Sequence, residues 1–233
     1  MIMKKRWSAI YFMGIGITLM MIFGTEKVSQ VMSQEHMISR THCVILDAGH
    51  GGIDGGAVSC TGKTESAINL EIALKLEPLF RLMGYDTRMI RREDISIHTG
   101  GDTIAQKKIS DLKERVRVVN ETPGGILLSI HQNTFQDSRY SGAQVFYAQT
   151  EGSWAMADAV QQRLAYVLDP SNTRKCKPCT GVYLMEHIER PGILVECGFI
   201  SNLTEESMLR DDRYQKKLSA AVATAVCTLL NGA

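Results

Sequence analysis

Four short segments of the sequence carry side chains that could bind a metal ion or transfer a proton. His50 lies among glycines, Glu65 follows Thr64, and His131 and Glu196 each follow an apolar, β-branched run. Two histidines and one glutamate leave one position of a tetrahedral zinc ion open for water, as in a catalytic rather than a structural site. A second glutamate near that water would transfer the proton. The pattern therefore predicts a zinc hydrolase that uses one Zn²⁺ ion.

Each of these four residues also has a simpler structural explanation. The glycines around His50 could cradle a phosphate, but the segment lacks both the Gly-x-Gly-x-x-Gly spacing and the Gly-Lys-Ser/Thr ending of phosphate loops. Glu65 could merely cap a helix, and His131 could be a hydrogen-bonded core residue. Glu196 could form a structural salt bridge. However, a carboxylate in an apolar run is costly to bury alone, and burial would raise its pKa toward that of a general base.

Alternating strand and helix patterns must position these residues. The predicted strands cover residues 43–46, 85–90, 125–130, 143–147 and 192–195, and the predicted helices cover residues 64–83, 103–120, 153–168 and 212–230. This alternation predicts an α/β fold, a single domain with a twisted, largely parallel sheet flanked by helices on both faces. An open sheet of this kind places its active-site groups at the carboxyl ends of its strands.

The first 41 residues differ in character from the rest of the chain. Lys4, Lys5 and Arg6 precede an uncharged, apolar stretch at residues 7–23, which is just long enough to cross a hydrocarbon core. No Ala-x-Ala cleavage site follows, which favours an uncleaved anchor over a signal peptide. We therefore expect a signal anchor at residues 1–24, a spacer at 25–41 and the catalytic domain at 42–233. Cations on the N-terminal side predict attachment to the cell membrane with the catalytic domain outside the cytoplasm.

Composition and cysteine content add two further limits. The 233 residues have a formal net charge of +1 and are 44% hydrophobic, which suits one well-packed domain and gives no indication of nucleic-acid binding. Cys43 and Cys197 lie in apolar runs and are expected to be small core residues. Cys176 and Cys179 form a C-x-x-C pair without a second pair. This favours a local disulfide or two idle thiols over a redox or zinc motif.

The four segments, in their order, resemble those of zinc-dependent N-acetylmuramoyl-L-alanine amidases of the amidase-3 type. They read LDAGHGG at 46–52, TESAINL at 64–70, SIHQN at 129–133 and LVECGFISN at 194–202. The resemblance spans roughly residues 43–231. It implies zinc ligation by His50, Glu65 and His131, catalysis by Glu196, and peptidoglycan as the substrate. Arg91 and Arg115 also match the family, without an assigned chemical role.

The resemblance also narrows the function. The compact chain and its N-terminal segment are most similar to the spore-cortex, germination-specific branch, whose members remove peptides from muramic acid on the way to muramic-δ-lactam. Two other functions remain open from the residues alone. One is a zinc peptidase acting on wall peptides, and the other is a non-catalytic, membrane-tethered wall-binding protein. The sequence also leaves open whether an activating protein partner is required.

Overall fold

The computed structural model describes residues 42–232, which belong to one compact unit that begins at His42. The expected anchor and spacer lie outside these residues. Within residues 42–232 no helix combines the length and apolar character needed to span a bilayer.

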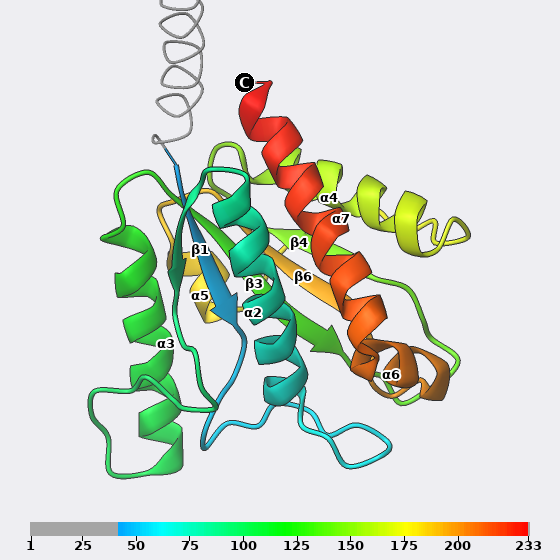
Figure 1. Cartoon of the computed structure of the whole chain (residues 1–233). Helices are drawn as coiled ribbons and strands as arrows, with labels where there is room; N and C mark the ends of the chain where they lie inside the picture. Colours follow the sequence, from blue (N-terminus) through cyan, green and yellow to red (C-terminus); the bar gives the residue numbers. More distant parts are fainter. Residues whose placement is uncertain (1–41, 233) are drawn as a thin grey trace, which may run out of the picture. The chain divides into compact units, whose positions relative to one another are not determined.

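The domain is built on one six-stranded sheet with the order β2-β1-β3-β6-β4-β5 (Figure 1). The strands are β1 (Cys43–Ala48), β2 (Asp86–Met89), β3 (Gly125–Asn133), β4 (Gln144–Tyr147), β5 (Lys177–Pro178) and β6 (Gly192–Phe199). Strands β2, β1, β3 and β6 pair in parallel, and β4 pairs with β6 antiparallel. The expected parallel sheet is therefore confirmed for four strands, while an antiparallel pair makes the complete sheet mixed.

Helices cover both faces of the sheet, as expected. The helices are α2 (Glu65–Leu82), α3 (Ile104–Asn120), α4 (Ser153–Leu168), α5 (Tyr183–His187), α6 (Leu203–Arg210) and α7 (Asp212–Asn231). Helices α2, α4 and α7 pack with one face of the strands in the larger core, and α3 and α5 pack with the other face in a smaller core. In Figure 1, α2 and α7 cross in front of the strands and α5 lies behind them.

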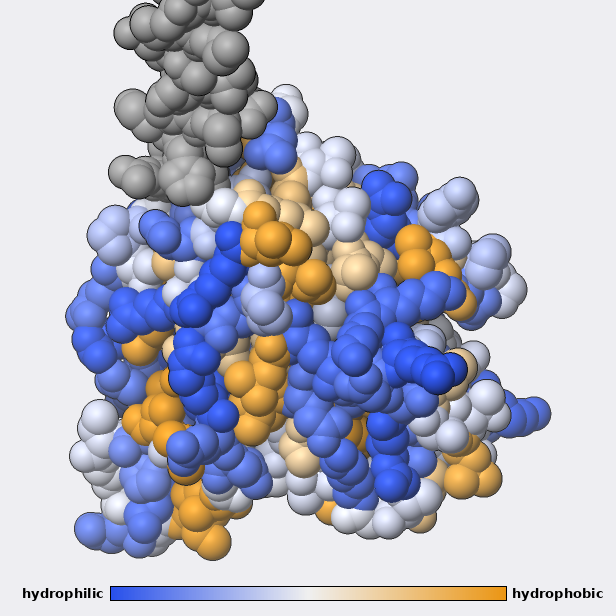
Figure 2. All heavy atoms as spheres, viewed as in Figure 1, coloured by the Kyte–Doolittle hydropathy of each residue, from blue (hydrophilic) through white to orange (hydrophobic). Residues whose placement is uncertain are grey.

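Helix α2 shows how the apolar pattern fixes this packing. Ile68, Ile72, Leu76 and Phe80 recur every four residues, so they form one stripe, and all four are fully buried. The helix continues past Pro78, which lies in its last turns. Hydrophilic side chains cover most of the outer face that α2 and α7 form, with apolar side chains showing between them in separate groups (Figure 2).

Strands β1, β3 and β6 extend further than their apolar runs indicate. Strand β3 continues through Asn133 and β6 through Phe199, so His131 and Glu196 lie inside strands rather than after them. The parallel register between β3 and β6 continues through both polar residues and shifts only after His131. Strand β5 and helices α5 and α6 were not predicted because they are only two to eight residues long.

The two cysteines of the C-x-x-C pair lie against different cores. Cys176 packs against the larger core, whereas Cys179 belongs to the smaller core on the other face of the sheet. All six cysteines, which lie between residues 43 and 227, are free thiols. Of the two explanations that the sequence favoured, the structure therefore agrees with idle thiols.

Candidate metal centre and catalytic groove

His50 is positioned by the turn that follows β1. Its φ of 62° lies in the left-handed region, which is unfavourable for a residue with a Cβ. Arg115 holds this turn in place, because its Nη2 donates a hydrogen bond of 2.7 Å to the carbonyl oxygen of His50. The imidazole Nδ1 lies 3.0 Å from Asp54 Oδ2, which fixes the orientation of the ring.

Glu65 is the first residue of α2, and its carboxylate is held by several donors. The backbone N–H groups of Ala57 and Gln132 donate to its two oxygens over 3.0 and 3.1 Å. The Asn69 amide donates to Glu65 Oε1 and also to the carbonyl oxygen of Gly49, over 3.3 and 3.2 Å. Glu65 therefore does more than cap the helix, since Thr64 is the cap residue and the carboxylate points toward the sheet edge.

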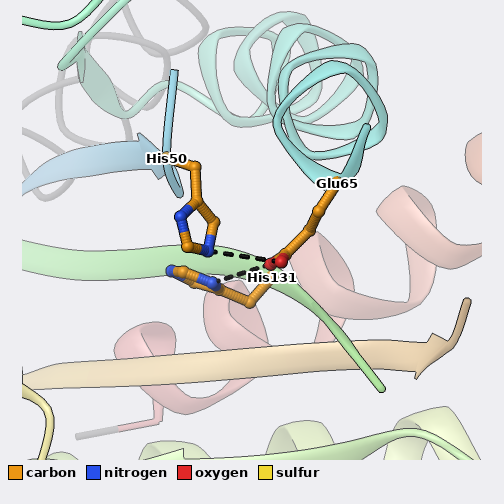
Figure 3. Close-up of side chains that lie close together, drawn as sticks. All are labelled: His50, Glu65 and His131. Carbon is orange, nitrogen blue, oxygen red and sulfur yellow. Dashed lines mark hydrogen bonds and ion pairs between the residues drawn. The ribbon is translucent and has the colours of Figure 1, made fainter. Parts of the chain in front are cut away.

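The three predicted ligands converge at this edge of the sheet (Figure 3). His50 Nε2 lies 3.2 Å from Glu65 Oε2, and His131 Nδ1 lies 3.0 Å from Glu65 Oε1. One potential ligand atom from each residue lies within 4.8 Å of the other two. Two imidazoles and one carboxylate are a donor set that suits zinc. The cluster is thus consistent with a single metal site.

Gly49 leaves the space that this convergence requires. A Cβ atom at position 49 would lie 2.2 Å from His131 Nε2, well inside van der Waals contact. The glycine before His50 therefore allows the backbone of the β1 turn to approach the imidazole of His131. Any larger residue at position 49 would displace either this backbone or the His131 imidazole.

Hydrogen bonds and charge interactions link Glu65 to the two histidines of the cluster. Burial opposes the charged form of His50, but the hydrogen bonds that its ring donates to the Glu65 and Asp54 carboxylates outweigh burial and raise the pKa of His50 to about 9. Burial would likewise raise the pKa of Glu65, yet the hydrogen bonds and charges of His131 and His50 hold it far below its usual range. Imidazole and carboxylate groups this close together can bind a metal ion, with release of any protons that they hold.

Glu196 lies beside the cluster on β6, paired in register with His131 on β3. Its Oε2 is buried and has no hydrogen-bond partner within residues 42–232. Burial is the main cause that raises the pKa of Glu196 to about 7; the charge of His131 lowers this pKa and the charge of Glu65 raises it, both to a smaller extent. A carboxyl with a free oxygen and a pKa near neutrality has the properties that proton transfer requires.

Three residues that support the cluster had no predicted chemical role. Arg91 donates to the carbonyl oxygens of Ala48, Gly49 and Ser66, so it ties the β1 turn to α2. Arg115 pairs with buried Asp47, one strand position before that turn. Both arginines match the family pattern, but sequence alone does not show that their partners are backbone carbonyls. Asp54 was also missed, although an acidic residue four positions after His50 was a visible signal.

A groove of about 400 Å³ opens over the cluster. Its lining includes His50, His131 and Glu196, together with Asp54 and Lys108. Val182, Tyr183 and Leu184, at the start of α5, line another part and are mainly apolar. The groove therefore offers both polar and apolar contacts around a single reactive centre.

Comparisons with known proteins agree with this geometry. The Amidase_3 family, described as N-acetylmuramoyl-L-alanine amidase, matches residues 44–228. A germination-specific N-acetylmuramoyl-L-alanine amidase from Bacillus subtilis is 35% identical over 185 residues, which cover 77% of this chain and 76% of that protein. The amidase AmiA of Escherichia coli is 27% identical over 227 residues, covering 78% and 74% of the two chains.

Solved structures show the same similarity. The CwlD amidase from Clostridioides difficile, solved in complex with the GerS lipoprotein, aligns with a TM-score of 0.79 and 36% identity, covering 82% of this chain and all of that one. An N-acetylmuramoyl-L-alanine amidase from Clostridium difficile 630 aligns with a TM-score of 0.72 and 27% identity, covering 82% and 97%. This chain belongs to the Amidase_3 family and is an N-acetylmuramoyl-L-alanine amidase that hydrolyses peptidoglycan.

Proposed function

We propose that His50, Glu65 and His131 hold one Zn²⁺ ion and that Glu196 is the general base and acid of the amidase reaction. The observation that carries this assignment is the convergence of the three ligand groups beside a carboxyl with an unpartnered oxygen. When bound, the metal supplies Lewis-acid polarisation of the scissile carbonyl and lowers the pKa of water.

The protein side chains account for the proton transfers. Glu196 accepts a proton from the attacking water, whose oxygen bonds to the lactyl carbonyl carbon of muramic acid. Glu196 then donates that proton to the departing nitrogen of L-alanine as the C–N bond breaks. Asp54 and Asn69 keep His50 and Glu65 oriented throughout, because each contacts its partner from outside the reaction centre.

The position of the new amine tests this reaction directly. The full chain in detergent is incubated with purified peptidoglycan, with and without a chelator, and released amines are labelled and identified. An amidase exposes the amino group of L-alanine, whereas a wall peptidase exposes an amine within the stem peptide. Labelled L-alanine that disappears with the chelator and returns with added Zn²⁺ is the expected result. Labelling of a different residue would contradict it.

We infer further that the enzyme acts on spore cortex peptidoglycan. The supporting observation is the similarity to the germination-specific amidase of Bacillus subtilis over most of both chains. Removal of the peptide leaves a muramic acid that can then close into its δ-lactam. Deletion of the gene in a spore-forming host should therefore produce cortex that retains stem peptides and lacks muramic-δ-lactam. Normal cortex composition in the deletion strain would exclude this role.

We also propose that residues 1–24 anchor the enzyme in the cell membrane, with residues 42–233 outside the cytoplasm. The uncharged stretch after Lys4, Lys5 and Arg6 supports this placement. Intact mass of the native protein from the membrane fraction tests it, since cleavage near residue 24 would shorten the chain. A protein partner is a related proposal, supported by the complex of the CwlD amidase with a lipoprotein.

A further inference from the structure

The groove contains one exposed cation besides the histidines. Of the residues between 42 and 232 that line it, Arg115 and Lys108 are the only arginine and lysine. The Arg115 side chain is almost fully buried and already forms ion pairs with Asp47 and Asp111. The Lys108 side chain, in contrast, is 46% exposed. Lys108 is therefore the cation of this groove that a substrate can reach.

The ammonium group of Lys108 has spare hydrogen-bonding capacity. Its Nζ lies 2.8 Å from Asp54 Oδ1, and Asp54 is the one acceptor that it contacts within residues 42–232. An ammonium group has three donors, so two remain for a second acceptor. Asp54 does not depend on this lysine alone, since it also accepts a hydrogen bond from Gly56 N and contacts His50 Nδ1. Lys108 can therefore bind an incoming carboxylate without releasing Asp54.

The distance from Lys108 to the reaction centre sets which part of the substrate it meets. Asp54 and the imidazole of His50 connect Lys108 Nζ to His50 Nε2 through contacts of 2.8 and 3.0 Å. The ammonium group consequently lies within about 10 Å of the metal-facing nitrogen, whereas two residues of extended peptide span about 7 Å. A carboxylate on the residue that follows L-alanine is within reach.

We propose that Lys108 is a specificity-determining residue that binds a free carboxylate on the second residue of the stem peptide. The inference rests on the amidase site proposed above and names the substrate group that its groove recognises. An ammonium–carboxylate contact is a charge-assisted hydrogen bond, and partial exposure reduces its contribution. We expect it to change kcat/KM about tenfold, mainly through KM.

Two muropeptides that differ in one group test this proposal. Both carry N-acetylmuramoyl-L-alanine with the same second residue, whose free carboxyl is intact in one and converted to the amide in the other. The full chain, Lys108→Met, Lys108→Arg and the control Lys113→Met are compared at equal metal content. Lys113 is exposed on the same helix and does not line the groove. We expect the wild type, Lys108→Arg and Lys113→Met to prefer the acidic substrate, and Lys108→Met to lose that preference.

Three results would overturn the inference. The first is a wild type that cleaves both substrates equally, and the second is a Lys108→Met variant that keeps the preference. The third is an equal loss on both substrates in Lys108→Met together with a weaker zinc affinity, measured separately by chelator competition, since this would assign Lys108 to positioning of Asp54 and His50. These results differ from failure of the proposed function itself, in which the wild type would release L-alanine amine from neither substrate. A preference that weakens as salt concentration rises supports the charge contact.

Discussion

His131 and Glu196 lie directly opposite each other on the neighbouring parallel strands β3 and β6. Residues paired in this way project to the same face of the sheet, and the strands of a sheet are about 4.8 Å apart. Both side chains line the catalytic groove. The sheet itself thus sets the spacing between a proposed metal ligand and the proposed base. This spacing does not depend on a flexible loop.

The variants Glu196→Gln and Glu65→Ala should separate proton transfer from metal binding. Glu196→Gln keeps the size of the side chain and should retain bound zinc, but turnover should fall by about 10²–10⁴-fold because the base is lost. Glu65→Ala removes one of three ligands and should lose both zinc and activity. Zinc per chain and release of L-alanine amine are the two measurements. Equal zinc loss in both variants would make Glu196 a ligand, and near-normal turnover in Glu196→Gln would exclude it as the base.

The variant Gly49→Ala should reduce activity by displacing the His131 imidazole. Its new Cβ atom would lie 2.2 Å from His131 Nε2, so the imidazole must move. A shift of about 1 Å in a catalytic group can cost roughly 100-fold in rate, and we expect a loss of that order together with weaker zinc binding. Gly100→Ala is the matched control, because no heavy atom lies within 4 Å of its Cβ position. Similar activities in the two variants would show that Gly49 does not limit the geometry.

The variant Asp54→Asn should weaken metal binding without removing a ligand. The carboxylate oxygen that contacts His50 Nδ1 at 3.0 Å orients this ring, and an amide is a poorer partner. Loss of such an outer contact typically lowers metal affinity about 10–100-fold. Competition with a chromogenic chelator measures the affinity, and Asp137→Asn, at an exposed ion pair far along the sequence, provides the comparison. An unchanged zinc affinity would show that Asp54 does not set the orientation of His50.

The buried Asp47–Arg115 pair should make stability depend on pH in the acid range. Burial opposes the charged form of Asp47, but the charge of Arg115 and the hydrogen bond from Ser129 outweigh it and lower its pKa. Because the folded-state pKa lies below the unfolded value of about 3.9, the stabilisation is complete above that pH and is lost as pH falls through the folded-state pKa. Asp47→Asn should therefore lower the free energy of unfolding most at neutral pH.

Urea unfolding at pH 6 and pH 3 measures this dependence. Removing one partner of a buried pair costs about 3–5 kcal/mol, and the lower end applies here because Asp111 still pairs with Arg115. The difference in the free energy of unfolding between the wild type and Asp47→Asn should be smaller at pH 3 than at pH 6. Asp137→Asn, which affects an exposed pair, should have the same free energy of unfolding as the wild type at both pH values. A constant difference for Asp47→Asn would mean that titration of Asp47 contributes nothing to acid sensitivity.

The sequence by itself determined the α/β class and the identities of the groups that gather at the site. Apolar runs before His131 and Glu196 mark strands, and apolar residues at helical spacing between residues 64 and 83 mark a helix, because both signals depend only on local periodicity. The glycines around His50 identify a sharp turn after a strand. These local patterns singled out His50, Glu65, His131 and Glu196 as candidates, and the family resemblance then implied a role for each.

The tertiary structure decided everything that depends on partners distant in the sequence. The antiparallel pairing of β4 with β6 follows from which strand edges meet, which no local pattern records. Arg91 and Arg115 brace the His50 turn through backbone carbonyls, and every residue has a carbonyl, so sequence cannot identify which ones they contact. The position of Lys108 beside Asp54 likewise arises only when α3 packs next to the β1 turn. The residue types follow from local chemistry, whereas their distances and charges follow from long-range packing.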